Sequence, residues 1–309
     1  MPKAGSGMQP ITSLDQMVDH VIRSGIKKKV AVACGEDQNT ISAIFRAVKS
    51  GFAEAIMVGC KNKIEQRAKE EHIDPSIFNI IHVDHPSDAI DKALELVKTG
   101  EADVLMKGLV GTDEFLKAVL DKNKGLLPPN AIMSYVAVMQ IPAYHKLLFV
   151  SDTAVLPFPD LKQKLAEIKY CIKMANAFGI EKPKVALIGA SEKVSPNFPN
   201  TIDYSAICKM AERKQLPNCI VDGPLDIFLA CDKKSIAIKG VITPVDGDAD
   251  ILIFPSLDAC NSFYKGLMLF AGAELGGLIQ GTEKPVVVMS RSESENSKYY
   301  CIAMSCLMA

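Results

Sequence analysis

The residues best suited to chemistry are Ser290 and Arg291, which follow a short apolar run near the end of the sequence. Ser292 or Ser294 would then cap a final helix that begins at about residue 292. Backbone N–H groups at a helix start, together with a hydroxyl and a guanidinium, form a site for an anion such as phosphate. The alternative is a surface ion pair between Arg291 and a nearby glutamate, and the local sequence leaves both open.

Lys107 is a second candidate, because it ends the apolar run that starts at residue 104 and stands directly before Gly108. A cation at the end of a buried strand can point into a ligand site. It can also extend its ammonium into solvent along the strand end. Thr112 is the expected cap of the helix that follows.

Four further candidates lie in the second half of the chain. Gly189 and Ser191 follow the apolar stretch that starts at residue 184, at the kind of strand end where parallel sheets bind ligands. Asn261 and Lys265 are four residues apart and therefore share one face of the helix expected over residues 259–271. The Asn261 amide, in the first turn of that helix, either caps it or binds a ligand. We assign all four to substrate binding.

The glycine-rich stretch over residues 271–281 allows a backbone to approach a ligand closely, although turns are the commoner reason for such glycines. It lacks the spacing and the preceding strand of a dinucleotide-binding loop. His82, Asp84 and His85 have the side-chain types of metal ligands. Their place at a strand end before a proline favours a structural role, so we expect no metal site.

The composition restricts the class of protein. The net charge is -1, which gives no general attraction to nucleic acid or to an anionic membrane. No apolar run reaches the roughly 18 residues that span a bilayer, and the polar N-terminus lacks a signal-peptide core. The nine cysteines include no C-x-x-C pair, which indicates reduced thiols in the cytoplasm rather than disulfides or zinc.

Short apolar runs alternate with amphipathic stretches along the 309 residues, which predicts α/β architecture with parallel sheets. Between about residues 125 and 160 two apolar runs are separated only by residues 142–145, which predicts an antiparallel hairpin. The proline-containing stretch before it suits a linker. We therefore predict two doubly wound α/β domains with an interdomain cleft. The expected strands cover residues 29–35, 53–59, 79–83, 104–108, 184–191, 218–222, 249–255 and 284–290.

Several strings together resemble the phosphate acetyl/butyryltransferase family, and most closely its phosphate butyryltransferase branch. These strings are MKGLVGT from Met106, SDTAVLPFPD from Ser151, VDGPL from Val221, GDADILIFP from Gly247 and KPVVVMSRS from Lys284. They occur in the family's order, and the resemblance extends from Lys29 to the C-terminus.

The resemblance implies a fold like that of isocitrate and isopropylmalate dehydrogenases. The first domain would comprise residues 1–131 and 294–309, and the second residues 132–293. It implies the reaction acyl-CoA + phosphate = acyl phosphate + CoA, without a metal or redox cofactor, in a homodimer or larger homo-oligomer. Ser290 and Arg291 match the family's catalytic Ser-Arg pair. Asn261 and Lys265 match its GN-x-x-YK element, in which Cys260 replaces the glycine.

The sequence departs from the acetyltransferase pattern at one point. Those relatives carry an aspartate seven residues after the serine, proposed as the base acting on CoA, whereas this chain has Ser297. The departure permits a catalytically weak CoA- or phosphate-binding domain as an alternative to a butyryltransferase. A phosphate acetyltransferase is a second alternative. An acyltransferase that uses acyl carrier protein and a metal-dependent dehydrogenase of the same fold are more distant ones.

Overall fold

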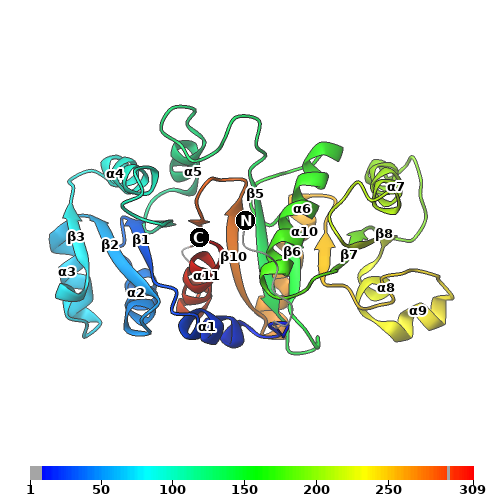
Figure 1. The fold of residues 1–309 in the computed structure, drawn as a ribbon, viewed down its shortest axis with the longest axis horizontal. Coiled ribbons are helices and arrows are strands. Elements are labelled where there is room, and N and C mark those ends of the chain that lie inside the picture. The colour runs from blue at the N-terminus through cyan, green and yellow to red at the C-terminus, as the bar shows by residue number, and fades with distance from the viewer. Residues whose placement is uncertain (1–8, 291–292) are drawn as a thin grey trace. The chain divides into compact units, whose positions relative to one another are not determined.

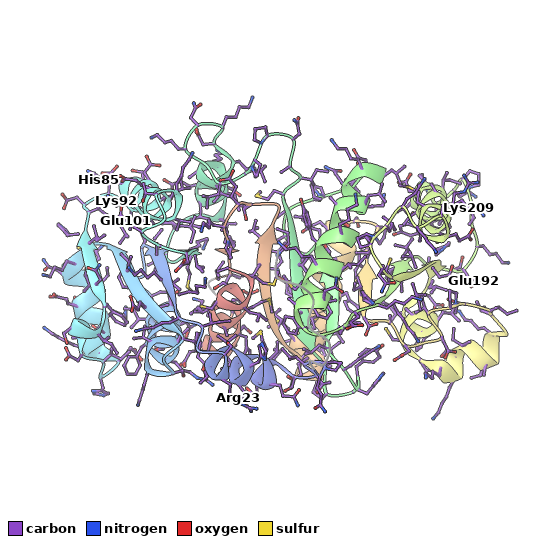
Figure 2. All side chains as sticks on the ribbon, in the orientation of Figure 1. Arg23, His85, Lys92, Glu101, Glu192 and Lys209 are labelled. Atoms are coloured by element: carbon purple, nitrogen blue, oxygen red, sulfur yellow. The ribbon has the colours of Figure 1, made fainter. Side chains whose placement is uncertain are left out.

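The computed structural model describes residues 9–290 and 293–309, which divide between two compact units (Figure 1). Unit 1 contains the N-terminal residues to Leu14 and Ser134–Ala273. Unit 2 contains Asp15–Met133 and Glu274–Ala309. Each unit has its own strands and helices and is described by itself. Exposed charged side chains such as Arg23, Glu101 and Lys209 project from the surface (Figure 2).

The sheet of unit 2 has the strand order β3-β2-β1-β4-β11-β10. Neighbouring strands in it are parallel, except that β10 and β11 are antiparallel. The middle strands are buried and almost wholly apolar, as parallel strands covered by helices must be. The strands are β1 (Lys28–Ala33), β2 (Ala53–Gly59), β3 (Asn79–His82), β4 (Val104–Lys107), β10 (Glu274–Gln280) and β11 (Val286–Val287).

Helix α11 (Glu295–Met308) is the central helix of unit 2. Its residues from Ser297 to Cys306 are all buried, and it packs against β10 and α2 (Figure 1). A helix that is covered on every side needs no polar face, which explains its mixed, weakly patterned sequence. The other helices are α1 (Leu14–Arg23), α2 (Gln38–Lys49), α3 (Lys61–Glu70), α4 (Pro86–Lys98) and α5 (Thr112–Leu120), with a 3₁₀ turn at Pro75–Ile77.

Unit 1 contains the sheet β5-β6-β9-β7-β8. Strands β5 (Ser134–Gln140) and β6 (Leu148–Ser151) form the predicted antiparallel hairpin, which is confirmed. The other neighbours are parallel: β6 with β9 (Ile251–Ile253), β9 with β7 (Lys184–Ile188), and β7 with β8 (Ile220–Leu225). The helices are α6 (Leu161–Ala177), α7 (Pro199–Glu212), α8 (Ile227–Cys231), α9 (Lys233–Lys239) and α10 (Leu257–Ala271).

The α/β fold class is confirmed, but the glycine-rich stretch near residue 276 was misinterpreted. It forms β10 rather than a turn or a ligand loop. A Cβ on Gly276 would lie 2.8 Å from the Cε atom of Met304, so this glycine makes room for α11. The predicted cap of α5 is also corrected. Gly111 is the N-cap of this helix, and Thr112 is its first residue.

The two units differ from the predicted domains at residues 274–293. That stretch was assigned to the second domain, whereas it lies in unit 2 because β11 pairs with β4. The predicted change of domain after residue 131 falls close to the observed change after Met133. The interdomain cleft stays a prediction. No helix among residues 9–290 and 293–309 is both long and apolar enough to cross a bilayer.

Candidate active site

Lys107 and Ser290 lie at the same edge of the unit 2 sheet. Strands β4 and β11 are parallel neighbours, with Val287 opposite Met106, so the carboxyl ends of the two strands lie at the same edge of the sheet. Ligands of open parallel sheets bind beyond this edge. The structure therefore brings these two predicted residues to the place where a ligand is expected.

Lys107 is buried, with 4% of its surface exposed, so it does not extend into solvent. Its Nζ donates a hydrogen bond to the Gly108 carbonyl at 3.2 Å. Gly108 itself passes close to β1: a Cβ there would lie 2.2 Å from the carbonyl oxygen of Cys34. Only glycine permits this approach, and it fixes the chain that carries the lysine.

Ser290 is exposed and lies shortly before α11 in the sequence. Its N–H donates to the Oε2 atom of Glu293 at 2.8 Å, and the Glu293 N–H donates back to the Ser290 carbonyl at 3.3 Å. Arg291 lies outside the described residues, as does Ser292. Ser294 is the N-cap of α11 and accepts a hydrogen bond from the Ser297 N–H, which confirms one of the two predicted caps.

Ser297 is the residue at which the resemblance expects the aspartate of acetyltransferases. It is 1% exposed, in the first turn of α11, and its Oγ receives a hydrogen bond from the Ser294 hydroxyl at 3.2 Å. A serine hydroxyl cannot replace a carboxylate as a base without a partner that removes its proton. The structure thus offers no carboxylate at this position.

The start of α11 is bound to α2 by contacts that the sequence did not predict. The Nζ of Lys298, which is 4% exposed, lies 3.0 Å from Asp37 Oδ1 and 3.1 Å from Thr40 Oγ1. Burial acts to raise the pKa of Asp37, but hydrogen bonds from Thr40 and the Lys298 charge outweigh it and lower the pKa. Arg46 adds a hydrogen bond to Asn296 at 2.7 Å. These partners are far apart in sequence, and no local pattern connects them.

In unit 1, Gly189 and Ser191 follow β7 at the carboxyl edge of the sheet. The Gly189 N–H donates to the Leu225 carbonyl at 2.9 Å, so it is already used within the sheet. A Cβ at this glycine would lie 2.9 Å from the Cβ of Pro224. The half-buried Ser191 accepts a hydrogen bond from the Lys193 N–H at 3.4 Å. Any phosphate contact from this segment would thus come from beyond Gly189.

Asn261 and Lys265 lie on α10, one turn apart, as predicted. Ser256 caps this helix by accepting from the Ala259 N–H, so Asn261 has a different role from the predicted cap. The Asn261 Nδ2 donates to the Thr153 carbonyl at 3.0 Å, in the loop after β6. Lys265 is exposed, with its Nζ 5.8 Å from the centre of the Tyr264 ring.

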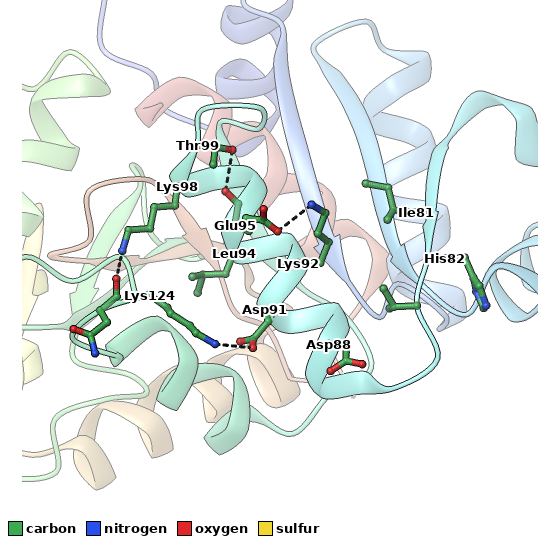
Figure 3. Close-up of a pocket in the computed structure, with 12 residues that line it drawn as sticks. Ile81, His82, Asp88, Asp91, Lys92, Leu94, Glu95, Lys98, Thr99 and Lys124 are labelled. Atoms are coloured by element: carbon green, nitrogen blue, oxygen red, sulfur yellow. Dashed lines mark hydrogen bonds and ion pairs between the residues drawn. The ribbon is translucent and has the colours of Figure 1, made fainter.

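One cavity of unit 2 contains none of these residues. It measures about 690 Å³ and lies around α4, between β3 and the segment at Asn123 (Figure 3). Two of its three lysines are paired with carboxylates, Lys92 with Glu95 at 2.9 Å and Lys124 with Asp91 at 3.3 Å, and the third, Lys98, donates to the Asn123 carbonyl. Because each lysine already binds an oxygen of the protein, this cavity is a poor anion site.

The His82 and Asp84 pair forms a local contact, with His82 Nε2 3.3 Å from Asp84 Oδ1. The other ring nitrogen of His82 accepts a hydrogen bond from the Lys61 N–H. The second contact holds the end of β3 to the start of α3, in line with the structural role predicted for this segment. The described residues contain no group of three or more side chains placed to hold a metal ion.

Solved structures with this fold define the class of protein. A branched-chain phosphotransacylase from Enterococcus faecalis V583 matches with a TM-score of 0.79 and 29% identity, over 91% of this chain and 99% of that chain. A putative 4-hydroxythreonine-4-phosphate dehydrogenase from Salmonella typhimurium shares the fold alone, with a TM-score of 0.54 and 12% identity over 92% and 99% of the two chains. The predicted dehydrogenase-like fold agrees with this.

Sequence comparison identifies the family. The profile of the phosphate acetyl/butaryl transferase family matches residues 82–306. A phosphate butyryltransferase from Clostridium acetobutylicum is 40% identical over 288 residues, 93% of this chain and 95% of the relative. A phosphate acetyltransferase from Thermotoga maritima is 38% identical over 299 residues, 96% and 99% of the two chains. The chain belongs to the phosphate acetyl/butaryl transferase family, which confirms the resemblance.

Proposed function

We propose that this protein is a phosphate acyltransferase that exchanges a short acyl group between coenzyme A and inorganic phosphate, with butyryl as the preferred group. The observation that carries the proposal is the 40% identity to a phosphate butyryltransferase over nearly the whole chain. The buried cation of Lys107, beside the strand that leads to Ser290, supports it. Such a site suits an anionic substrate.

The proposed reaction needs little covalent chemistry from the protein. A phosphate oxygen attacks the thioester carbonyl, the C–S bond breaks, and a proton ends on the sulfur of CoA. Lys107 and Arg291 offset the charge of phosphate, and the Ser290 hydroxyl donates to the departing sulfur. Bringing two anions together and stabilising the tetrahedral oxyanion account for most of the rate increase.

The residues of unit 1 are proposed to bind the substrates. Exposed Lys265 suits a phosphate group of CoA. The Asn261 amide is held in place by its hydrogen bond to the Thr153 carbonyl, and its oxygen would accept a hydrogen bond from a substrate. Ser191 offers a hydroxyl near the end of β7, and Gly189 lets β8 approach closely. No metal or redox cofactor enters this scheme, so activity should survive dialysis against a chelator.

The test is release of thiol from acetyl-, propionyl-, butyryl- and branched acyl-CoA, with and without phosphate. The proposal expects phosphate-dependent release, fastest with butyryl-CoA, and a loss of about a hundredfold or more in Arg291→Ala. Fastest release with acetyl-CoA would favour a phosphate acetyltransferase. Binding of CoA without release would instead favour the weak binding domain that Ser297 allows.

We also propose a cytoplasmic homodimer or larger homo-oligomer. All nine cysteines are free thiols, which suits a reducing compartment. The C-terminal half of α10 exposes Leu269 by 76% and Phe270 by 85%. Large apolar side chains side by side in solvent are unusual for a monomer and suit a protein interface.

A further inference from the structure

A carboxyl group in the interior of unit 1 has no part in the proposed chemistry. Glu167 on α6 is 0% exposed, and neither of its carboxyl oxygens has a hydrogen-bond partner among the described residues. An ionised carboxylate without donors is so unfavourable in an apolar interior that the group takes up a proton instead. Burial, and then the charge of Asp152, hold the pKa of Glu167 well above its ordinary range, while Lys164 opposes the shift.

Asp152, directly after β6, is the opposite case. It is 1% exposed, yet its carboxylate accepts four hydrogen bonds. The donors are the Ala154 N–H at 2.7 Å, the Val155 N–H at 2.8 Å, the Ser134 hydroxyl at 2.9 Å and the Tyr135 N–H at 3.1 Å. Backbone N–H groups can only donate, so they require an acceptor and favour the ionised form of Asp152. Burial acts in the other direction and raises its pKa.

The two carboxyl groups compete for a single negative charge. Two neighbouring buried carboxyls do not both ionise, because each charge raises the cost of the other. Asp152 has four donors and Glu167 has none. The charge therefore belongs to Asp152 and the proton to Glu167.

The other groups near Glu167 do not supply a free positive charge. Lys164 is buried but its Nζ is bound to Asp203 at 2.9 Å and to the Pro159 carbonyl. Helix α6 packs on β5, β6, β9 and α7, of which β9 carries only isoleucine and leucine. The remaining titratable groups that interact with Glu167 are three whose pKa burial raises, so that they stay neutral: Cys171, Tyr204 and Cys260.

The Asp152 charge shapes the loop that holds Asn261. The N–H groups of Ala154 and Val155 donate back to Asp152, and Thr153, between Asp152 and Ala154, turns its carbonyl to Asn261. We propose that Glu167 is a positioning residue for acyl exchange: in its protonated form it leaves Asp152 the single charge of this interior, and its ionisation loosens the loop that orients Asn261. The inference rests on the substrate-binding role proposed for Asn261.

Stability as a function of pH tests the protonation without any substrate. Above the ordinary glutamate pKa of 4.5, the unfolded chain has lost the Glu167 proton while the folded chain keeps it. The unfolding equilibrium constant of the wild type should then rise about tenfold per pH unit relative to Glu167→Gln, until Glu167 ionises in the folded state. Urea unfolding at intervals from pH 6 to 9 measures this. The exposed Glu181→Gln is the matched control and should run parallel to the wild type.

Enzyme kinetics test the positioning. Glu167→Gln should keep its kcat and its KM for butyryl-CoA within about twofold of the wild type at pH 7, because the amide is neutral like the protonated acid. The wild-type KM should rise above that of Glu167→Gln only at the pH where the two stability curves stop diverging. If the stability curves of the wild type and Glu167→Gln ran parallel, Glu167 would not be protonated in the folded chain. If the KM of Glu167→Gln for butyryl-CoA were raised tenfold at pH 7, the proposed positioning role would be wrong. Absence of turnover in every variant, with diverging stability curves, would instead count against the proposed function.

Discussion

At the scale of single residues, Lys107 is the clearest test of the site. Lys107→Met keeps the apolar stem and removes the buried charge, so the fold should persist while phosphate loses its cation. We expect kcat/KM for phosphate to fall by about a hundredfold or more. Lys117→Met removes an exposed lysine from nearby α5 and should leave kinetics unchanged. Equal phosphate kinetics in both variants would remove Lys107 from the site.

Gly108 tests how the backbone places that lysine. Gly108→Ala would set a Cβ 2.2 Å from the Cys34 carbonyl, so β1 or β4 must shift. We expect a loss of about 1–3 kcal/mol in the free energy of unfolding. Gly266→Ala, in α10 with no atom within 4 Å of its new Cβ, should instead gain up to about 1 kcal/mol. Urea unfolding of the two variants measures this difference in sign.

Residue types could be predicted from the sequence more readily than their contacts. Lys107 and Ser290 follow apolar strands, so their place at a carboxyl edge followed from the alternation of strands and helices. The burial of Lys107 could not be predicted, because the sequence is the same whether a lysine at a strand end turns its side chain inward or outward. The contact of Asn261 with Thr153 joins residues 108 apart in sequence, beyond any local pattern.

At the scale of elements, the attachment of α11 to α2 decides where Ser290 stands. Lys298→Met would leave the Asp37 carboxylate partly buried and without its cation, at a cost of about 3 kcal/mol in unfolding free energy. Adding Asp37→Asn should restore much of that loss, since no uncompensated charge remains. The pKa of Asp37 is lower in the folded chain than its ordinary value of 3.8. The contribution of Asp37 to the free energy of unfolding is therefore present above pH 3.8 and is lost as the pH falls through the pKa of the folded state. Equal stability of wild type and Lys298→Met at pH 7 would contradict this.

Most helices and strands could be predicted from the sequence, but strand β10 could not. Buried parallel strands are continuous apolar runs, which made β1, β2 and β7 recognisable. Strand β10 was missed because glycines interrupt it. Those glycines are there for α11, which approaches within 2.8 Å of the Cβ position at residue 276. The glycines of β10 are explained by the packing of α11, a different element, so the local sequence pattern could not predict this strand.

At the scale of the whole molecule, the exposed end of α10 predicts association. Leu269→Glu or Phe270→Glu places a charge among apolar side chains that are 76% and 85% exposed in the single chain. A charge that must be buried without a partner would weaken a dimer by several kcal/mol, enough to yield monomers at micromolar concentration. Gln215→Glu adds the same charge at an exposed site shortly after the end of α7. Light scattering should show a smaller mass only for the α10 variants, and equal masses for all three would exclude this end of α10 as an interface.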